Sequence, residues 1–165
     1  MHSSEGAAEN TRTTSASASS TATYDSPFPN PKTSWSDTSD SNPTFVFTGV
    51  DNTPGRKAFF IHLEAKPGNE EQLASFLRDI NDGVNKEPGT GPWFGTRFSK
   101  STFCIFEAFP DVEARNAHVH GPGGQNFGRL EYLKDTLAYP ARIHRLDVLH
   151  GKFGTMFGEK IGPVA

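Results

Sequence analysis

The sequence predicts an α+β protein of the ferredoxin-like class, in which the elements follow the order β-α-β-β-α-β and the sheet is antiparallel. Two observations carry this prediction. Apolar residues alternate with a period of two in several short segments, and they recur at helical spacing in two longer ones. These patterns lie within residues 56–153. We therefore divide the chain into an N-terminal tail over 1–55, one domain over 56–153 and a C-terminal tail over 154–165.

The N-terminal tail is rich in Ser and Thr, and we expect it to be disordered. Between residues 2 and 43 it contains no aliphatic side chain larger than alanine. It cannot bury enough apolar surface to offset the entropy lost on folding. Residues 44–50 differ, because Phe45 and Phe47 alternate in the manner of a strand. This stretch is compatible with an extra edge strand docked on the domain.

The domain begins with a strand, predicted over residues 57–66, and a helix that follows it. Pro67 and Gly68 end the strand. Asn69 is expected to cap the helix, with Gln72 at the capping-box position. One strand face carries Phe59, Ile61, Leu63 and Ala65, and the other carries Phe60, His62 and Glu64. The helix presents one apolar stripe formed by Leu73, Phe76, Leu77, Ile80 and Val84.

The second half of the domain contains a hairpin, a broken helix and a last strand. Residues 93–98 and 102–109 are rich in aromatic side chains and are joined by three residues, which predicts the hairpin. The helix is expected to start after its cap, Asp111, to break at the Gly-Pro-Gly-Gly run of 121–124 and to resume beyond it. Residues 141–150 form the last predicted strand.

Two helices on one face of a four-stranded sheet leave the other face bare. That face would expose Phe60 and other apolar side chains as a patch larger than soluble monomers tolerate. Burying it against a second copy of the chain removes the problem, so we expect a two-fold homodimer.

Composition narrows the classes of partner and compartment. The formal net charge is −3 with mixed signs, which gives no reason to expect a nucleic-acid or membrane partner. No apolar run is long enough to span a membrane, and no secretory signal is recognisable. The single cysteine, Cys104, allows no intrachain disulfide, so a cytoplasmic location is expected. Cys104 itself is predicted to be a buried, unreactive thiol.

Residues 58–149 resemble the antibiotic biosynthesis monooxygenase domain, one branch of the dimeric α/β barrels. The matching pieces are the strand and turn over 62–68, the Glu-Pro-Gly run at 87–89, and the strand over 103–111 followed by Ala117-His118. The last piece is the most specific, because it joins a strand that carries a carboxylate to a helix that carries a histidine.

The resemblance implies a cofactor-independent monooxygenase that acts on a small hydroxyaromatic or quinol-type molecule inside each protomer. No cofactor is expected, because the anion of such a substrate can pass electrons directly to oxygen. Related domains differ in function, and fold alone does not choose among them. We therefore keep two alternative hypotheses. The protein could be a non-oxidative cyclase, isomerase or lyase, or a non-catalytic dimeric ligand-binding or stress-response protein.

Two histidines are the candidate catalytic bases. His118 matches the helix histidine of the family and shares a helix face with Ala114, Ala117 and Gly121, whose small size would leave room for a pocket. A pKa near neutrality suits a histidine to accept a phenolic proton. His62 lies in mid-strand and is the second candidate. Each could instead be structural, His118 between helix and sheet and His62 at the dimer interface.

A further group of side chains is predicted to contact the substrate. The aromatic ones could stack on it, although core packing also explains them. Glu107 lies in a strand rich in Phe, where we expect it to be half-buried and to pair with Arg97 or Arg115. No metal site is expected, because His118 and His120 point about 200° apart on a helix. The predicted substrate-binding residues are Trp93, Arg97, Phe103, Phe106, Glu107 and His120.

Overall fold

The computed structural model of the chain describes residues 34–49, 53–152, 155–156 and 159–160. The tail predicted to be disordered lies outside the described residues up to position 33, as does most of the C-terminal tail. The elements in chain order are η1 Trp35–Asp37, β1 Phe45–Gly49, β2 Lys57–Glu64, α1 Glu70–Val84, β3 Trp93–Arg97, β4 Thr102–Phe109, α2 Val112–His120, η2 Gly124–Gly128, α3 Leu130–Thr136, β5 Ala141–Asp147, β6 Thr155–Met156 and β7 Glu159–Lys160.

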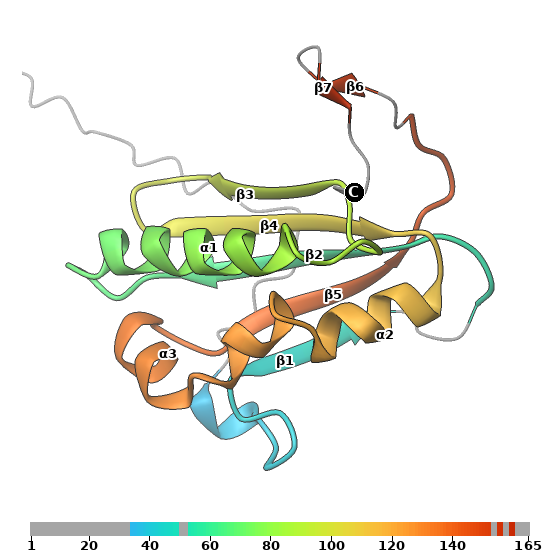
Figure 1. Cartoon of the computed structure of the whole chain (residues 1–165). Coiled ribbons are helices and arrows are strands. Elements are labelled where there is room, and N and C mark those ends of the chain that lie inside the picture. Colours follow the sequence, from blue (N-terminus) through green and yellow to red (C-terminus); the bar gives the residue numbers. More distant parts are fainter. Residues whose placement is uncertain (1–33, 50–52, 153–154, 157–158, 161–165) are drawn as a thin grey trace, which may run out of the picture. The chain divides into compact units, whose positions relative to one another are not determined.

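The main sheet has five strands in the order β1-β5-β2-β4-β3 (Figure 1). Strands β2 to β5 pair antiparallel, which confirms the predicted α+β, ferredoxin-like arrangement. Strand β1 adds an edge in parallel to β5, with Phe45 opposite Ala141. Thr44, just before β1, is buried and donates a hydrogen bond to the carbonyl of Phe127. The folded part of the chain therefore includes this strand.

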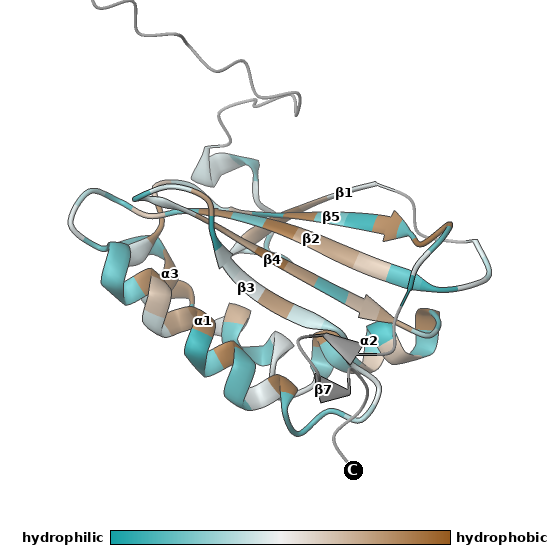
Figure 2. Cartoon of the chain, turned by 90° about the horizontal axis from the view of Figure 1, so that it is seen from above, coloured by the Kyte–Doolittle hydropathy of each residue, from teal (hydrophilic) through white to brown (hydrophobic). Residues whose placement is uncertain are grey.

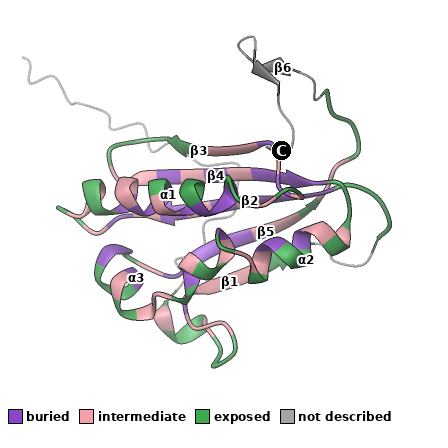
Figure 3. Ribbon diagram, in the orientation of Figure 1, coloured by how far each residue is buried: buried purple, intermediate pink, exposed green. Residues whose placement is uncertain are grey.

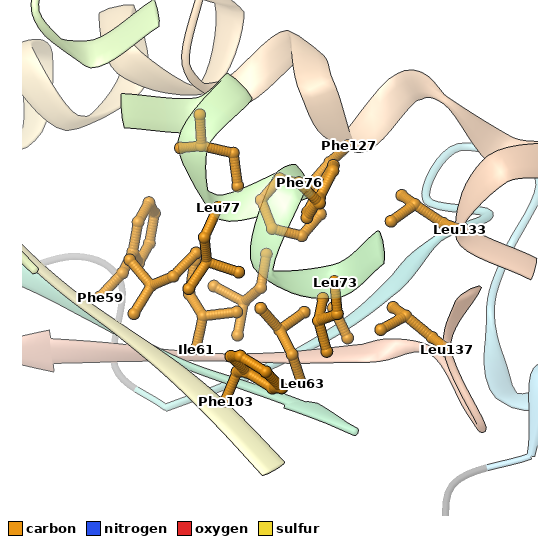
Figure 4. Close-up of a cluster of buried hydrophobic side chains, with 14 of the residues drawn as sticks. Phe59, Ile61, Leu63, Leu73, Phe76, Leu77, Phe103, Phe127, Leu133 and Leu137 are labelled. Carbon is orange, nitrogen blue, oxygen red and sulfur yellow. The ribbon is translucent and has the colours of Figure 1, made fainter. Parts of the chain in front are cut away.

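Helices α1, α2 and α3 all lie on one side of the sheet (Figure 2). The sheet residues that face them are the odd-numbered ones of β2 and β4, and burial is concentrated there (Figure 3). The predicted stripe of α1 is buried against this face. Figure 4 shows part of the resulting core, which includes Phe59, Ile61, Leu63, Leu73, Phe76, Leu77, Phe103, Phe127, Leu133 and Leu137.

The two predicted helix caps have different outcomes. Asp111 caps α2, since its side chain accepts a hydrogen bond from the backbone N–H of Ala114 at 2.8 Å. Asn69 occupies the N-cap position of α1 but makes no side-chain cap bond there. Its amide donates to the carbonyl of Asp135 instead, so the predicted capping box with Gln72 is wrong. The side chain links α1 to the end of α3.

The predicted break in the second helix separates α2 from α3 and packs closely against α1. A Cβ atom added to Gly83 of α1 would lie 2.6 Å from the backbone nitrogen of Gly123. Only glycine allows the backbones to approach this closely. The close approach brings Gly123 beside the loop that follows α1, and this loop contributes to the site described below.

Within the described ranges, no helix is both long enough and apolar enough to cross a membrane.

Candidate active site

A buried histidine stands between two glutamates at the centre of the candidate site. His118 lies near the end of α2, Glu107 on β4, and Glu87 in the loop between α1 and β3. The imidazole Nδ1 lies 2.6 Å from Glu87 Oε2, and Nε2 lies 3.1 Å from Glu107 Oε1. The side chain of Glu107 is 1% exposed and that of His118 is 5% exposed. The array is therefore shielded from water. Charges interact more strongly in such a buried site than in water.

Glu87 holds three segments of the chain together. Its Oε1 accepts a hydrogen bond from the backbone N–H of Gly123 at 2.7 Å, in the helix break. Its Oε2 accepts from the Thr90 hydroxyl at 2.7 Å and contacts His118. A charged acceptor with several donors is worth more than a neutral one. The loop after α1, the end of α2 and the helix break are thus joined at one carboxylate.

The two carboxylates determine the charge of His118. Burial alone lowers the pKa of His118, but the contacts of the ring with Glu107 and Glu87, and the negative charge of these two groups, outweigh burial and raise the pKa to about 9. Burial raises the pKa of Glu87. Its contacts with His118, Gly123 and Thr90 lower the pKa by more than burial raises it, so the net shift is downward. At pH 7 the ring is therefore an imidazolium. A protonated ring must lose its own proton before it can accept another, and the role of His118 as a base stays a prediction.

Glu107 has unused hydrogen-bonding capacity. Its separation from His118 is that of an ion pair, but neither of its carboxylate oxygens has a hydrogen-bond partner among the described residues. The indole Nε1 of Trp93 is likewise buried without a partner there. Trp93 and Glu107 are direct cross-strand neighbours on β3 and β4. A buried polar group left unsatisfied costs about 1–3 kcal/mol, so a hydrogen bond to either group would be stabilising.

Two aromatic side chains of the sheet pack beside His118. Its ring lies 5.2 Å from the ring of Phe109 and 6.4 Å from that of Phe59, centroid to centroid. Ala117, which was expected to border a pocket, is exposed. Two acidic and two aromatic side chains thus surround the imidazole. Of the two arginines predicted to pair with Glu107, Arg97 pairs with Glu71 instead, and Glu107 contacts His118.

His62 and Phe106 lie on the opposite side of the sheet from His118. The register places both on the helix-free face, with Phe60 opposite Phe106 and His62 opposite Cys104. Burial lowers the pKa of His62 and Glu64 only partly offsets this, so the ring is neutral at pH 7. The structure therefore separates the two histidines that the sequence proposed as alternative bases.

The remaining predicted site residues lie away from the array. Arg97 is exposed and pairs with Glu71 at 3.2 Å. Phe103 is 2% exposed and belongs to the hydrophobic core. His120 is exposed at the end of α2. Cys104 is half-buried on the helix-free face, less buried than predicted, and burial raises the pKa of its thiol.

Glu87 was not among the residues predicted for the site. It lies in a Gly/Pro-rich loop, where no periodicity indicates the direction of a side chain. One signal was present, since the Glu-Pro-Gly run at 87–89 is part of the family resemblance. In the parts of the chain that the structure describes, no three His, Cys, Asp or Glu side chains are grouped so as to hold a metal ion.

Comparison with solved structures confirms the predicted family fold. A protein of unknown function from Nitrosomonas europaea matches with a TM-score of 0.55 and 37% sequence identity, over 62% of this chain and 97% of that one. A candidate antibiotic biosynthesis monooxygenase from the same organism matches with a TM-score of 0.52 and 14% identity, over 61% of this chain and 97% of that one. Another from Caulobacter crescentus matches with a TM-score of 0.51 and 19% identity, over 59% and 92%.

The chain thus has the fold of the antibiotic biosynthesis monooxygenase domain. At 37% identity over nearly the whole of its relative, it belongs to one family with the Nitrosomonas europaea protein of unknown function. No protein-family model and no curated protein matches the sequence.

Proposed function

We propose that the protein is a cofactor-independent monooxygenase acting on a small hydroxyaromatic or quinol-type molecule. The observation that carries this proposal is the buried array of Glu107, His118 and Glu87. It combines a carboxylate that can accept a hydroxyl hydrogen with a cation 3.1 Å away that can stabilise the anion left behind. The fold shared with candidate monooxygenases supports the reaction class.

The chemistry assigns a role to each side chain. Glu107 accepts the proton of the substrate hydroxyl, and the His118 imidazolium lowers the energy of the resulting anion. Glu87 keeps the imidazole oriented and charged. A substrate carbon that bears a hydrogen then gives two electrons to O2 and forms a carbon–oxygen bond, and the proton held by Glu107 passes to the peroxide to form a hydroperoxide. In the next step the O–O bond and this C–H bond break. Loss of water from the hydroperoxide leaves a carbonyl, so one oxygen atom stays in the product and the other becomes water. The electrons come from the substrate, so this route needs no cofactor.

A second candidate function is supported by the same pair. An imidazolium in contact with a carboxylate is an acid beside a base, which suits proton transfer between two atoms of a substrate. An isomerase or cyclase on this fold would use the two groups without consuming oxygen. Oxygen consumption therefore separates the two functions.

The test is oxygen uptake with a panel of quinols and polycyclic phenols, followed by mass spectrometry of the product formed under ¹⁸O2. We expect one ¹⁸O atom in the product and loss of turnover in Glu107→Gln. Glu113→Gln is the matched control, because Glu113 is an exposed carboxylate on α2. Turnover without oxygen uptake would favour the isomerase or cyclase. No turnover on any member of the panel would argue against an enzyme of this class.

We also propose that the active form is a homodimer paired through the helix-free face of the sheet. That face carries half-buried aromatic side chains, among them Phe60, Phe94 and Phe106. No described α-helix covers it (Figure 2). An apolar face of this kind is stabilised when a second copy covers it.

A further inference from the structure

The unsatisfied groups of the candidate site stand side by side and differ in chemistry. Trp93 and Glu107 face each other directly across β3 and β4, where opposite Cβ atoms are about 5 Å apart. The indole Nε1 of Trp93 can only donate, whereas carboxylate oxygens such as those of Glu107 accept. Both groups are buried, and neither has a hydrogen-bond partner among the described residues. A ligand that satisfies both must bring one donor and one acceptor.

Nearby side chains do not supply these partners. His118 contacts Glu107 at ion-pair distance, but without the alignment of a hydrogen bond. The Trp93 ring lies over Gly95, since a Cβ atom added there would lie 2.8 Å from the ring, and the side chain packs against the hydrophobic core. The position of the indole is therefore set by its apolar side, and its N–H is left available.

We propose that Trp93 and Glu107 are a two-point anchor for the substrate. A neutral hydroxyl of the ligand donates to Glu107, and a second oxygen of the ligand accepts from the indole N–H of Trp93. This inference rests on the proposed function and narrows its substrate to aromatic molecules with two oxygen substituents, at least one of them a hydroxyl. Trp93 acts through its polar edge, in place of the stacking role that the sequence indicated.

The charges of the array favour entry of the ligand in its neutral form. Glu87 and Glu107 both contact the His118 ring, and a ligand that arrives as an anion adds a further negative charge beside Glu107. A phenol with a pKa near 10 is neutral at pH 7. It donates to Glu107 first, and its proton leaves only after binding.

The experiment measures ligand affinity under nitrogen, where no oxygenation occurs. The probes are hydroquinone and catechol, which carry two oxygens at different spacings, phenol, which carries one, and 1,4-dimethoxybenzene, which has no donor. Titration calorimetry gives the dissociation constants. The indole N–H signal of Trp93 in ¹H–¹⁵N spectra reports its hydrogen bond. The chain has two tryptophans, so in Trp35→Phe the only remaining indole N–H signal is that of Trp93.

We expect one of the two diols to bind about 10-fold more tightly than phenol and at least 10-fold more tightly than dimethoxybenzene, the usual value of one hydrogen bond in each case. Trp93→Phe should remove the advantage over phenol. Glu107→Gln should remove the advantage over dimethoxybenzene, whereas Glu64→Gln, a carboxylate on the other face of the sheet, should not. The Trp93 signal should shift with a diol and stay in place with dimethoxybenzene at matched occupancy.

Equal affinity for all probes, no binding by any of them, or an unmoved Trp93 signal would overturn the anchor, and the two groups would then be satisfied by trapped water. This failure is distinct from failure of the proposed function. Oxygen uptake together with equal affinity for all probes would overturn the proposed anchor and support the proposed monooxygenase. The expected order of affinities without any oxygen uptake would support the proposed anchor and overturn the proposed monooxygenase.

Discussion

The imidazole Nδ1 of His118 lies 2.6 Å from Glu87 Oε2, and this contact couples the charge of a helix residue to the loop that follows α1. Nδ1 must carry the hydrogen, because the carboxylate can only accept. The other ring nitrogen then faces Glu107. The contact thus sets both the orientation of the ring and the side from which a ligand meets it.

Replacing Glu87 should therefore change the titration of His118. Glu87→Gln keeps the size of the side chain but removes its charge, so we expect the pKa of His118 to fall from its value of about 9 towards the range of ordinary histidines. Two-dimensional NMR of the imidazole resonances against pH measures it. Glu113→Gln, on the exposed side of α2, should leave the His118 titration where it is. An unchanged titration in Glu87→Gln would mean that Glu107 alone holds the proton.

The raised pKa of His118 also predicts how stability depends on pH. The folded state binds a proton between pH 6.5 and about 9 that the unfolded state has lost, so stability should fall as pH rises through this window. The full contribution, on the order of 3 kcal/mol, is present below pH 6.5. Urea unfolding at pH 6.5 and pH 9 measures it. His118→Gln should flatten this dependence, whereas His150→Gln, at an exposed position, should keep it.

The order of helices and strands could be predicted from the sequence, as two features of the helices show. The stripe from Leu73 to Val84 is buried as predicted, because periodicity reports which helix face meets the sheet. The break after His120 is also where the Gly-Pro-Gly-Gly run placed it. Such features are local in the chain. They were enough to predict the order of elements and the class of fold.

The arrangement of the site could be predicted only in part. Strand alternation puts His62 on the same face as Phe60, opposite to Phe59, and this separates it from His118 once the helices are known to cover the Phe59 face. The link between His118 and Glu87 spans 31 residues and depends on how the helix break packs on Gly83. No pattern in the sequence encodes that distance, so the charge of His118 could not be foreseen.

The proposed dimer predicts a defined oligomeric state. The full chain should sediment at twice its monomer mass, about 36 kDa against 18.0 kDa. Phe106→Glu puts a charge on the helix-free face and should shift the equilibrium to monomer. Phe98→Glu is the matched control, because Phe98 is already 71% exposed at the hairpin. A wild-type chain that sediments as a monomer at micromolar concentration would rule the interface out.

The last prediction compares the two histidines that the sequence could not separate. If the Glu107–His118 pair carries the reaction, His118→Gln should lower turnover by about 10²–10⁴-fold, the usual value of a positioned proton-transfer group. It should also lower stability, since two buried carboxylates lose their cation. Turnover is therefore compared at a temperature well below the midpoint of unfolding of every variant. His62→Gln alters only the other face of the sheet and should leave turnover per folded protomer near that of the wild type.

The pH profile distinguishes a catalytic cation from a merely structural one. In the wild type, turnover should fall as pH rises through about 9, where His118 loses its proton. In Glu87→Gln the same fall should begin at a lower pH, because the cation is held less strongly. A structural His118 would lower the amount of folded protein without moving the profile. If turnover survives in His118→Gln and is lost in His62→Gln, the reaction takes place on the helix-free face, and the buried array only stabilises the fold.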